Sequence, residues 1–118
     1  MNFLIKTAYK EALKGRHPSQ KVGAVLYKGG CILGRASNMS RPFGLDNRGF
    51  HAEERLLNKC SKEKLEGATV VVVRTNLKGC ISSMSRPCPS CFNLLVENGI
   101  KKIVYIDWKN KIFVEKLQ

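Results

Sequence analysis

Apolar residues along the chain follow two periodicities, one helical and one extended. In residues 3–13 they recur every four positions while lysines fill the opposite side, which predicts an amphipathic helix. Short apolar runs at 22–27 and 31–34, separated by a glycine-rich turn, predict two strands of a hairpin. The run of four valines at 70–73 has no alternation, which is typical of a strand covered on both faces.

The same criteria predict helices at 51–60 and 87–97 and strands at 103–106 and 112–114, with 61–67 as a polar surface connector. The third and fourth strands are joined through a helix, so they should run parallel with a right-handed crossover. The last two strands are close enough in sequence to form a hairpin. The sequence therefore predicts an α/β protein with a three-layer α/β/α fold around a five-stranded mixed sheet that ends in a C-terminal β-hairpin.

Composition limits the architecture and the compartment. A chain of 118 residues, 43% of them hydrophobic, suits one domain over residues 1–118 with one core. No apolar run reaches the length of a membrane span, and the N-terminus is too briefly apolar for a signal peptide. We therefore expect a cytoplasmic protein without a membrane partner, in which the five cysteines stay reduced.

The charge balance points to an anionic partner. The formal net charge is +12, and the pI is about 9.8. Such an excess predicts attraction to nucleic acid, to nucleotides or to an anionic surface, and it does not choose among them.

Two short motifs carry the candidate chemistry. His51-Ala52-Glu53 opens one predicted helix, and Pro87-Cys88-Pro89-Ser90-Cys91 opens another. One imidazole and two thiolates form a three-ligand set for zinc, and the fourth tetrahedral position is left for water. Glu53, two residues after the histidine, is placed to handle the protons of that water.

The helix starts explain this spacing. Unpaired N–H groups and the helix dipole favour negative charge there, so we expect lowered pKa values for Cys88 and Cys91. Pro87 suits a first helical position because its missing N–H is not needed there. Two alternatives compete: a structural zinc with Cys80 as the fourth ligand, and a thioredoxin-like redox pair, which needs no histidine.

With these motifs, the chain resembles the cytidine deaminase-like superfamily along nearly its whole length. The resemblance implies zinc as the cofactor, with His51, Cys88 and Cys91 as its ligands. It also implies that Asn38 contacts the substrate sugar and that the Ala52 N–H holds the base carbonyl. Glu53 would then carry protons from water to the ring nitrogen and to the departing ammonia.

The resemblance does not select one branch of the superfamily. Histidine at position 51 differs from the cysteine of the free-cytidine deaminases, whereas the terminal hairpin at 103–114 is similar to that branch. The stretch 83–88 faintly resembles the Ser-Trp-Ser-Pro-Cys of polynucleotide editors, with Met84 in place of tryptophan and Arg86 inserted. The chain most resembles a small viral or bacterial member.

Two loops, at 38–50 and 76–87, precede the two ligand-bearing helices and should converge on the metal. Their cations suit phosphate and their flat side chains suit base stacking. The residues expected to bind substrate here are Arg41, Arg48, Phe50 and Arg86, with Phe43, Lys78 and Met84 nearby in sequence.

We therefore predict a zinc-dependent hydrolytic deaminase that converts cytosine to uracil in an anionic substrate. Its partner would be single-stranded DNA or RNA, slightly favoured by the charge, or a free cytosine nucleotide such as dCMP. An oligomer is compatible with the sequence. A tRNA adenosine deaminase and a non-catalytic nucleic-acid-binding module with a structural zinc stay open as alternatives.

Overall fold

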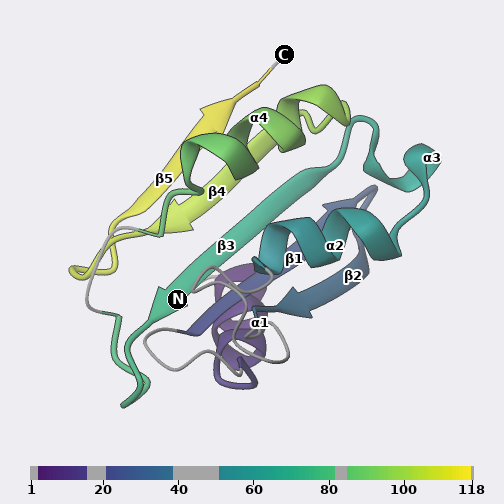
Figure 1. The fold of residues 1–118 in the computed structure, drawn as a ribbon. Coiled ribbons are helices and arrows are strands. Elements are labelled where there is room, and N and C mark those ends of the chain that lie inside the picture. Colours follow the sequence, from purple (N-terminus) through teal and green to yellow (C-terminus); the bar gives the residue numbers. More distant parts are fainter. Residues whose placement is uncertain (1–2, 16–20, 39–50, 82–84, 118) are drawn as a thin grey trace.

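Helices and strands are interspersed along the chain in the computed structural model, which describes residues 3–15, 21–38, 51–81 and 85–117 (Figure 1). No helix within these ranges is long and apolar enough to cross a membrane. The elements in chain order are α1 (Phe3–Ala12), β1 (Lys21–Lys28), β2 (Cys31–Ser37), α2 (Ala52–Lys59), α3 (Lys62–Leu65), β3 (Thr69–Thr75), α4 (Pro89–Glu97), β4 (Lys102–Ile106) and β5 (Ile112–Lys116).

The described strands form one mixed sheet in the order β2-β1-β3-β4-β5. β1 pairs antiparallel with both β2 and β3. β3 and β4 are parallel, with Val70 opposite Ile103, and α4 connects them. β4 and β5 form an antiparallel hairpin. The predicted parallel pair, terminal hairpin and five-stranded mixed sheet are all confirmed.

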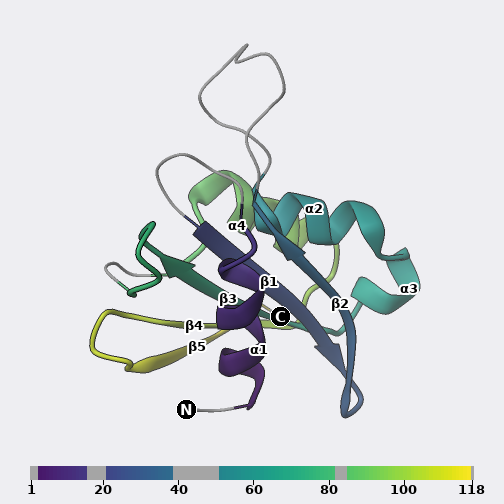
Figure 2. The same cartoon turned by 90° about the horizontal axis from the view of Figure 1, so that it is seen from below.

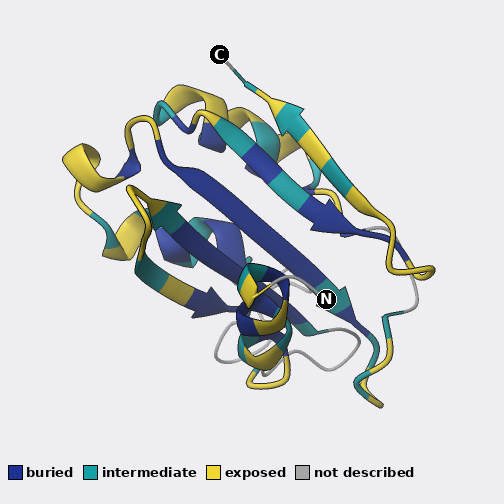
Figure 3. Ribbon diagram, turned by 180° about the vertical axis from the view of Figure 1, so that it is seen from behind, coloured by how far each residue is buried: buried dark blue, intermediate teal, exposed yellow. Residues whose placement is uncertain are grey.

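The central strand β3 is buried on both faces, as its unbroken valine run predicts. Val70 and Val72 pack in the core beneath α2 and α4. Val71 and Val73 face the opposite side and pack with residues of α1. Figures 1 and 2 show α2 and α4 on one side of the sheet, and Figure 3 shows α1 on the other. The three-layer fold is therefore confirmed.

α1 lies unusually close to β1, and Gly23 makes this approach possible. A Cβ built on Gly23 would lie 2.2 Å from the Ala8 carbonyl oxygen and 2.4 Å from the Ala12 nitrogen. Ala8 and Ala12 are themselves fully buried. Small residues on both elements thus set the distance between the helix and the sheet.

Several element boundaries differ from the prediction, among them the following three. Residues 61–67 contain the short helix α3, because Leu65 is buried at 3% exposure and anchors a turn within a charged stretch. β2 extends to Ser37, beyond the apolar run that ended at position 34. α4 starts at Pro89, with Cys88 as its N-cap, so the first helical position is taken by Pro89 and not by Pro87.

Helix α2 is fixed to the edge strand β2 by two basic side chains. The Arg55 guanidinium donates to the Ser37 carbonyl. Lys59 Nζ donates to the Arg35 carbonyl at 2.7 Å. These bonds cover two outward carbonyls of the edge strand.

We expect Gly23→Ala to destabilise the protein by about 3 kcal/mol, since the added methyl group meets backbone atoms that cannot rotate away. Urea unfolding measures this change. Gly30→Ala is the matched control: at φ +83° with open space around it, it should cost only the left-handed backbone strain of about 1 kcal/mol. Equal losses in the two variants would contradict the close approach of α1 to β1.

Candidate metal centre

The two motifs meet where α2 and α4 begin. Both helices lie over the same face of the sheet and start at the end where β3 and β4 finish (Figure 1). His51 is the N-cap of α2, and Cys88 is the N-cap of α4. Cys91 stands in the first turn of α4 and is fully buried. Segments 37 residues apart in sequence are therefore in contact.

Three donor atoms converge at this point. His51 Nδ1 lies 3.7 Å from Cys88 Sγ and 3.3 Å from Cys91 Sγ. All three atoms lie within 4.8 Å of one another. In a tetrahedral zinc site with usual bond lengths, nitrogen and sulfur ligands are separated by about 3.6 Å. The observed separations fit such a site, and they identify Nδ1 as the histidine donor.

The donor set suits zinc in an open site. Within the described ranges, the candidate metal-binding group consists of His51, Cys88 and Cys91. Cys80, the proposed fourth ligand of a closed site, is exposed and lies outside this group. Its backbone N–H is instead part of a turn closed by Asn76 Oδ1. Three protein ligands are the number that catalytic zinc sites use.

The two thiols have opposite electrostatic environments. Burial opposes ionisation of Cys88, but the Ser90 hydroxyl and the Cys91 N–H outweigh it and lower the pKa of Cys88. Burial raises the pKa of Cys91, and the negative charge of Glu53 adds to that rise. The prediction of lowered pKa values is therefore wrong for Cys91, where desolvation exceeds the effect of the helix terminus. A metal cation beside Cys91 would favour its thiolate form.

Glu53 is a buried carboxyl in the first turn of α2. It is only 3% exposed. Burial raises the pKa of Glu53, while its own backbone N–H and the charges of His51 and Arg74 oppose that rise. A carboxylate whose pKa is raised by burial is a stronger proton acceptor than a solvated glutamate.

Arg74 is a residue that the sequence analysis missed. It is the second-last residue of β3 and lies on the same face as Val70 and Val72, which is the face beneath α2 and α4. Its Nε is buried without a hydrogen-bond partner among the described residues, and its charge lowers the pKa of Glu53. The sequence did contain a signal for Arg74, which is a cationic residue directly after the buried valine run. Because side chains alternate along a strand, Arg74 faces the side of the sheet on which α2 and α4 begin.

Ala52 directly follows the candidate ligand His51, and Asn38 lies at the end of the β1–β2 hairpin. Asn38 follows β2 and is 4% exposed, and its Oδ1 accepts a hydrogen bond from the Val22 N–H at 2.8 Å. That oxygen therefore closes the end of the β1–β2 hairpin. Ala52 is fully buried as the first residue of α2, where a backbone N–H has no partner within the helix. Their substrate contacts stay predictions.

The remaining predicted substrate residues divide into two groups. Arg86 is described, and its guanidinium is paired with Glu115 on β5. The other expected contacts lie outside the described residues: Arg41, Phe43, Arg48, Phe50 and Met84.

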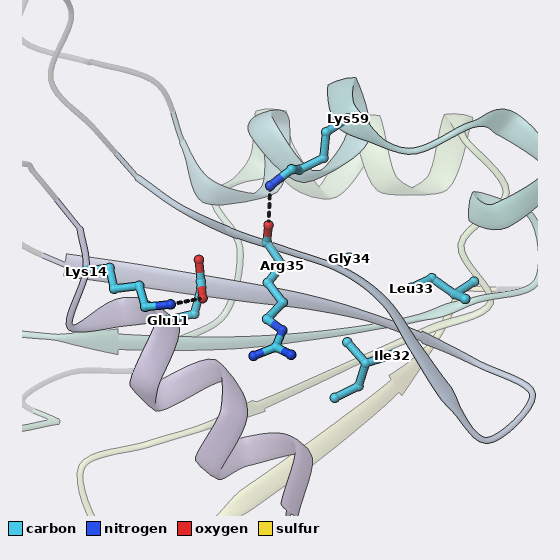
Figure 4. A pocket seen from close by; sticks show the side chains of 7 residues that line it. All are labelled: Glu11, Lys14, Ile32, Leu33, Gly34, Arg35 and Lys59. Atoms are coloured by element: carbon cyan, nitrogen blue, oxygen red, sulfur yellow. Dashed lines mark hydrogen bonds and ion pairs between the residues drawn. The ribbon is translucent and has the colours of Figure 1, made fainter.

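A separate groove of about 420 Å³ opens beside the edge strand β2 (Figure 4). It shares no residue with the metal centre, and Lys59 in its wall ends the helix that His51 begins. Lys14 and Glu11 form an ion pair there at 3.4 Å. Its lining residues are Glu11, Lys14, Ile32, Leu33, Gly34, Arg35 and Lys59. The groove is thus not part of the candidate chemistry.

Sequence comparison connects this geometry with known enzymes. Residues 1–107 match the family described as the cytidine and deoxycytidylate deaminase zinc-binding region. The chain is also 38% identical over 55 residues to the deoxycytidylate deaminase of Mycobacterium phage D29, a match covering 47% of this chain and 34% of that protein. The riboflavin biosynthesis protein RibD of Actinobacillus pleuropneumoniae is 36% identical over 94 residues, a match covering 80% of this chain and 22% of that protein. The matched part of this chain thus covers about a third of the first relative and less than a quarter of the second.

Solved structures with the same fold include two deaminases. The dCMP deaminase of cyanophage S-TIM5 is 27% identical, with a TM-score of 0.65 over 88% of this chain and 79% of that chain. Cytidine deaminase from Burkholderia pseudomallei, at 21% identity, has a TM-score of 0.71 over 99% of this chain and 94% of that chain. The superfamily resemblance, the fold and the zinc cofactor inferred from the motifs are therefore confirmed.

We expect the purified protein to contain one zinc per chain, and Cys88→Ser, Cys91→Ser to abolish it, because both thiolate ligands are removed. Elemental analysis measures the metal content. Cys80→Ser is the control, and it should retain zinc because Cys80 lies outside the candidate group. Loss of zinc in that control would indicate a closed structural site instead.

Proposed function

Because the chain belongs to the cytidine and deoxycytidylate deaminase family, we propose that it is a zinc-dependent hydrolase that converts cytosine to uracil and releases ammonia. The observation that carries this proposal is the meeting of His51 Nδ1 with Cys88 Sγ and Cys91 Sγ beside a buried carboxyl group. When bound there, zinc supplies a Lewis acid and lowers the pKa of water toward about 7.

Glu53 is the proposed proton carrier. Hydrolytic deamination adds one water to C4 of cytosine, breaks the C4–N bond and leaves a carbonyl group. Glu53 takes a proton from the attacking water and passes it to the ring nitrogen. It then takes the second proton from the new C4 hydroxyl group and delivers it to the amino group, which leaves as ammonia while the carbonyl forms. Its burial favours the protonated form between these transfers, and Arg74 favours the charged form. The Ala52 N–H is proposed to hold the base carbonyl, and Asn38 to contact the sugar.

A free cytosine nucleotide of the dCMP type is the substrate that the relatives favour. Both the phage D29 protein and the cyanophage S-TIM5 protein are dCMP deaminases. Arg86, assigned from sequence to substrate phosphate, is already paired with Glu115, which weakens that part of the polynucleotide interpretation. A reducing cytoplasm, proposed from the sequence, would suit the two thiolate ligands.

Single-stranded nucleic acid is the second candidate, and one observation favours it. The formal net charge of +12 exceeds what one mononucleotide phosphate requires. Arg41, Arg48 and Phe50 remain the proposed contacts for either substrate.

We expect Glu53→Ala to retain zinc and fold but to lose turnover by about 10²–10⁴-fold, because a positioned acid–base group is removed while the ligands stay. Uracil formation and zinc content are measured on the same sample. Glu63→Ala, an exposed carboxylate on α3, serves as the control with unchanged turnover. A Glu53→Ala protein as active as wild type would remove Glu53 from the mechanism.

Assayed side by side, dCMP should be deaminated with a shallow salt dependence, because one phosphate releases few counterions. A single-stranded substrate would instead lose affinity with a logarithmic slope of roughly −0.7 for each phosphate contact. Arg41→Ala, Arg48→Ala should flatten such a slope. If uracil forms in single-stranded oligonucleotides while dCMP is not deaminated, single-stranded nucleic acid replaces the free nucleotide as the proposed substrate.

A further inference from the structure

The segment that presents Cys88 to the metal centre is fixed to the sheet at Ser85. This serine is fully buried. Its Oγ accepts the Arg74 N–H at 2.9 Å, and its own N–H donates to the Ile106 carbonyl at 3.0 Å. Ser85 thus connects the ends of β3 and β4 just before the metal ligand.

The next residue, Arg86, is held from the opposite end of the chain. Arg86 Nε donates to Glu115 Oε2 at 2.7 Å, and Arg86 Nη2 donates to Glu115 Oε1 at 3.3 Å. This two-point arrangement restricts the guanidinium far more than one hydrogen bond does. The Tyr105 hydroxyl donates to the same Oε2 at 2.6 Å.

Aromatic rings complete the surroundings of this ion pair. The Arg86 guanidinium carbon stands 4.7 Å from the centre of the Phe92 ring on α4. The Tyr105 ring stacks on Phe113 with centroids 5.4 Å apart. Groups from β4, β5 and α4 therefore all fix Arg86, which is two residues from Cys88.

We propose that Arg86 and Glu115 are positioning residues that hold Cys88 in the geometry needed for zinc, and that Arg86 is not a phosphate ligand. The inference rests on the proposed zinc-dependent function. The Cys88 sulfur contacts the Ser90 hydroxyl of α4 at 3.5 Å, so α4 orients this side chain locally. The path from β3 through Ser85 and Arg86 sets where the Cys88 backbone enters the helix. Groups that support metal ligands tune metal affinity, and Arg86 does so through the backbone, two residues from Cys88.

The test compares Glu115→Gln, Arg86→Lys and the double variant with wild type. Zinc affinity is measured by competition with a chelator, and cobalt-substituted protein reports ligand geometry through its thiolate absorption. We expect each single change to weaken zinc binding by about two- to fivefold, because the Arg86–Glu115 ion pair is partly exposed to solvent. The double variant should bind zinc no more weakly than either single variant, because each single change already removes the same Arg86–Glu115 interaction. Thermal unfolding checks that each variant is folded.

Glu97→Gln is the matched control, an exposed carboxylate on α4 that should leave affinity and spectrum unchanged. Exchange of the pair, Arg86→Glu with Glu115→Arg, should restore part of the affinity. If Glu115→Gln keeps zinc affinity and the cobalt spectrum but lowers KM for dCMP, Arg86 is a phosphate ligand and the proposal is overturned. The metal readouts need no substrate, so they stay informative even if no deamination is found.

Discussion

Parallel pairing of β3 with β4 is the constraint on which the rest of the structure depends. A parallel pair needs a crossover, and α4 provides it from the carboxyl end of one strand. The start of α4 is thereby brought to the sheet end where α2 also starts. Without this pairing, nothing in the fold would bring His51 close to Cys91.

The metal centre combines two opposing physical effects. The N-termini of α2 and α4 favour the charged forms of the cysteines and of Glu53, whereas burial disfavours those charged forms. For Cys88 the local hydrogen bonds outweigh burial, and for Cys91 and Glu53 burial is the larger effect. A buried cation resolves the conflict for the thiolates, and the carboxyl group keeps its affinity for a proton. The residues proposed as ligands and the residue proposed for proton transfer therefore have different environments, although all of them lie at a helix start.

Local sequence patterns predicted every described helix and strand except α3. The unbroken apolar run identified the valine strand, and the two motifs predicted His51, Cys88 and Cys91, whose donor atoms the structure brings together. The pairing of Arg86 with Glu115 was not predictable, because the two residues are 29 apart and their contact depends on the β4–β5 register. Gly23 shows a similar limit, since its close approach to α1 exists only once helix and sheet have packed.

The bonds from Arg55 and Lys59 to the carbonyls of β2 bear on how this sheet meets other proteins. An uncovered edge strand can template the addition of a strand from another chain, which leads to aggregation or domain swapping. Here an incoming strand would have to displace charged side chains before it could pair with the carbonyls of Arg35 and Ser37. The β2 edge is thereby protected against misassembly by the same helix that begins with a metal ligand.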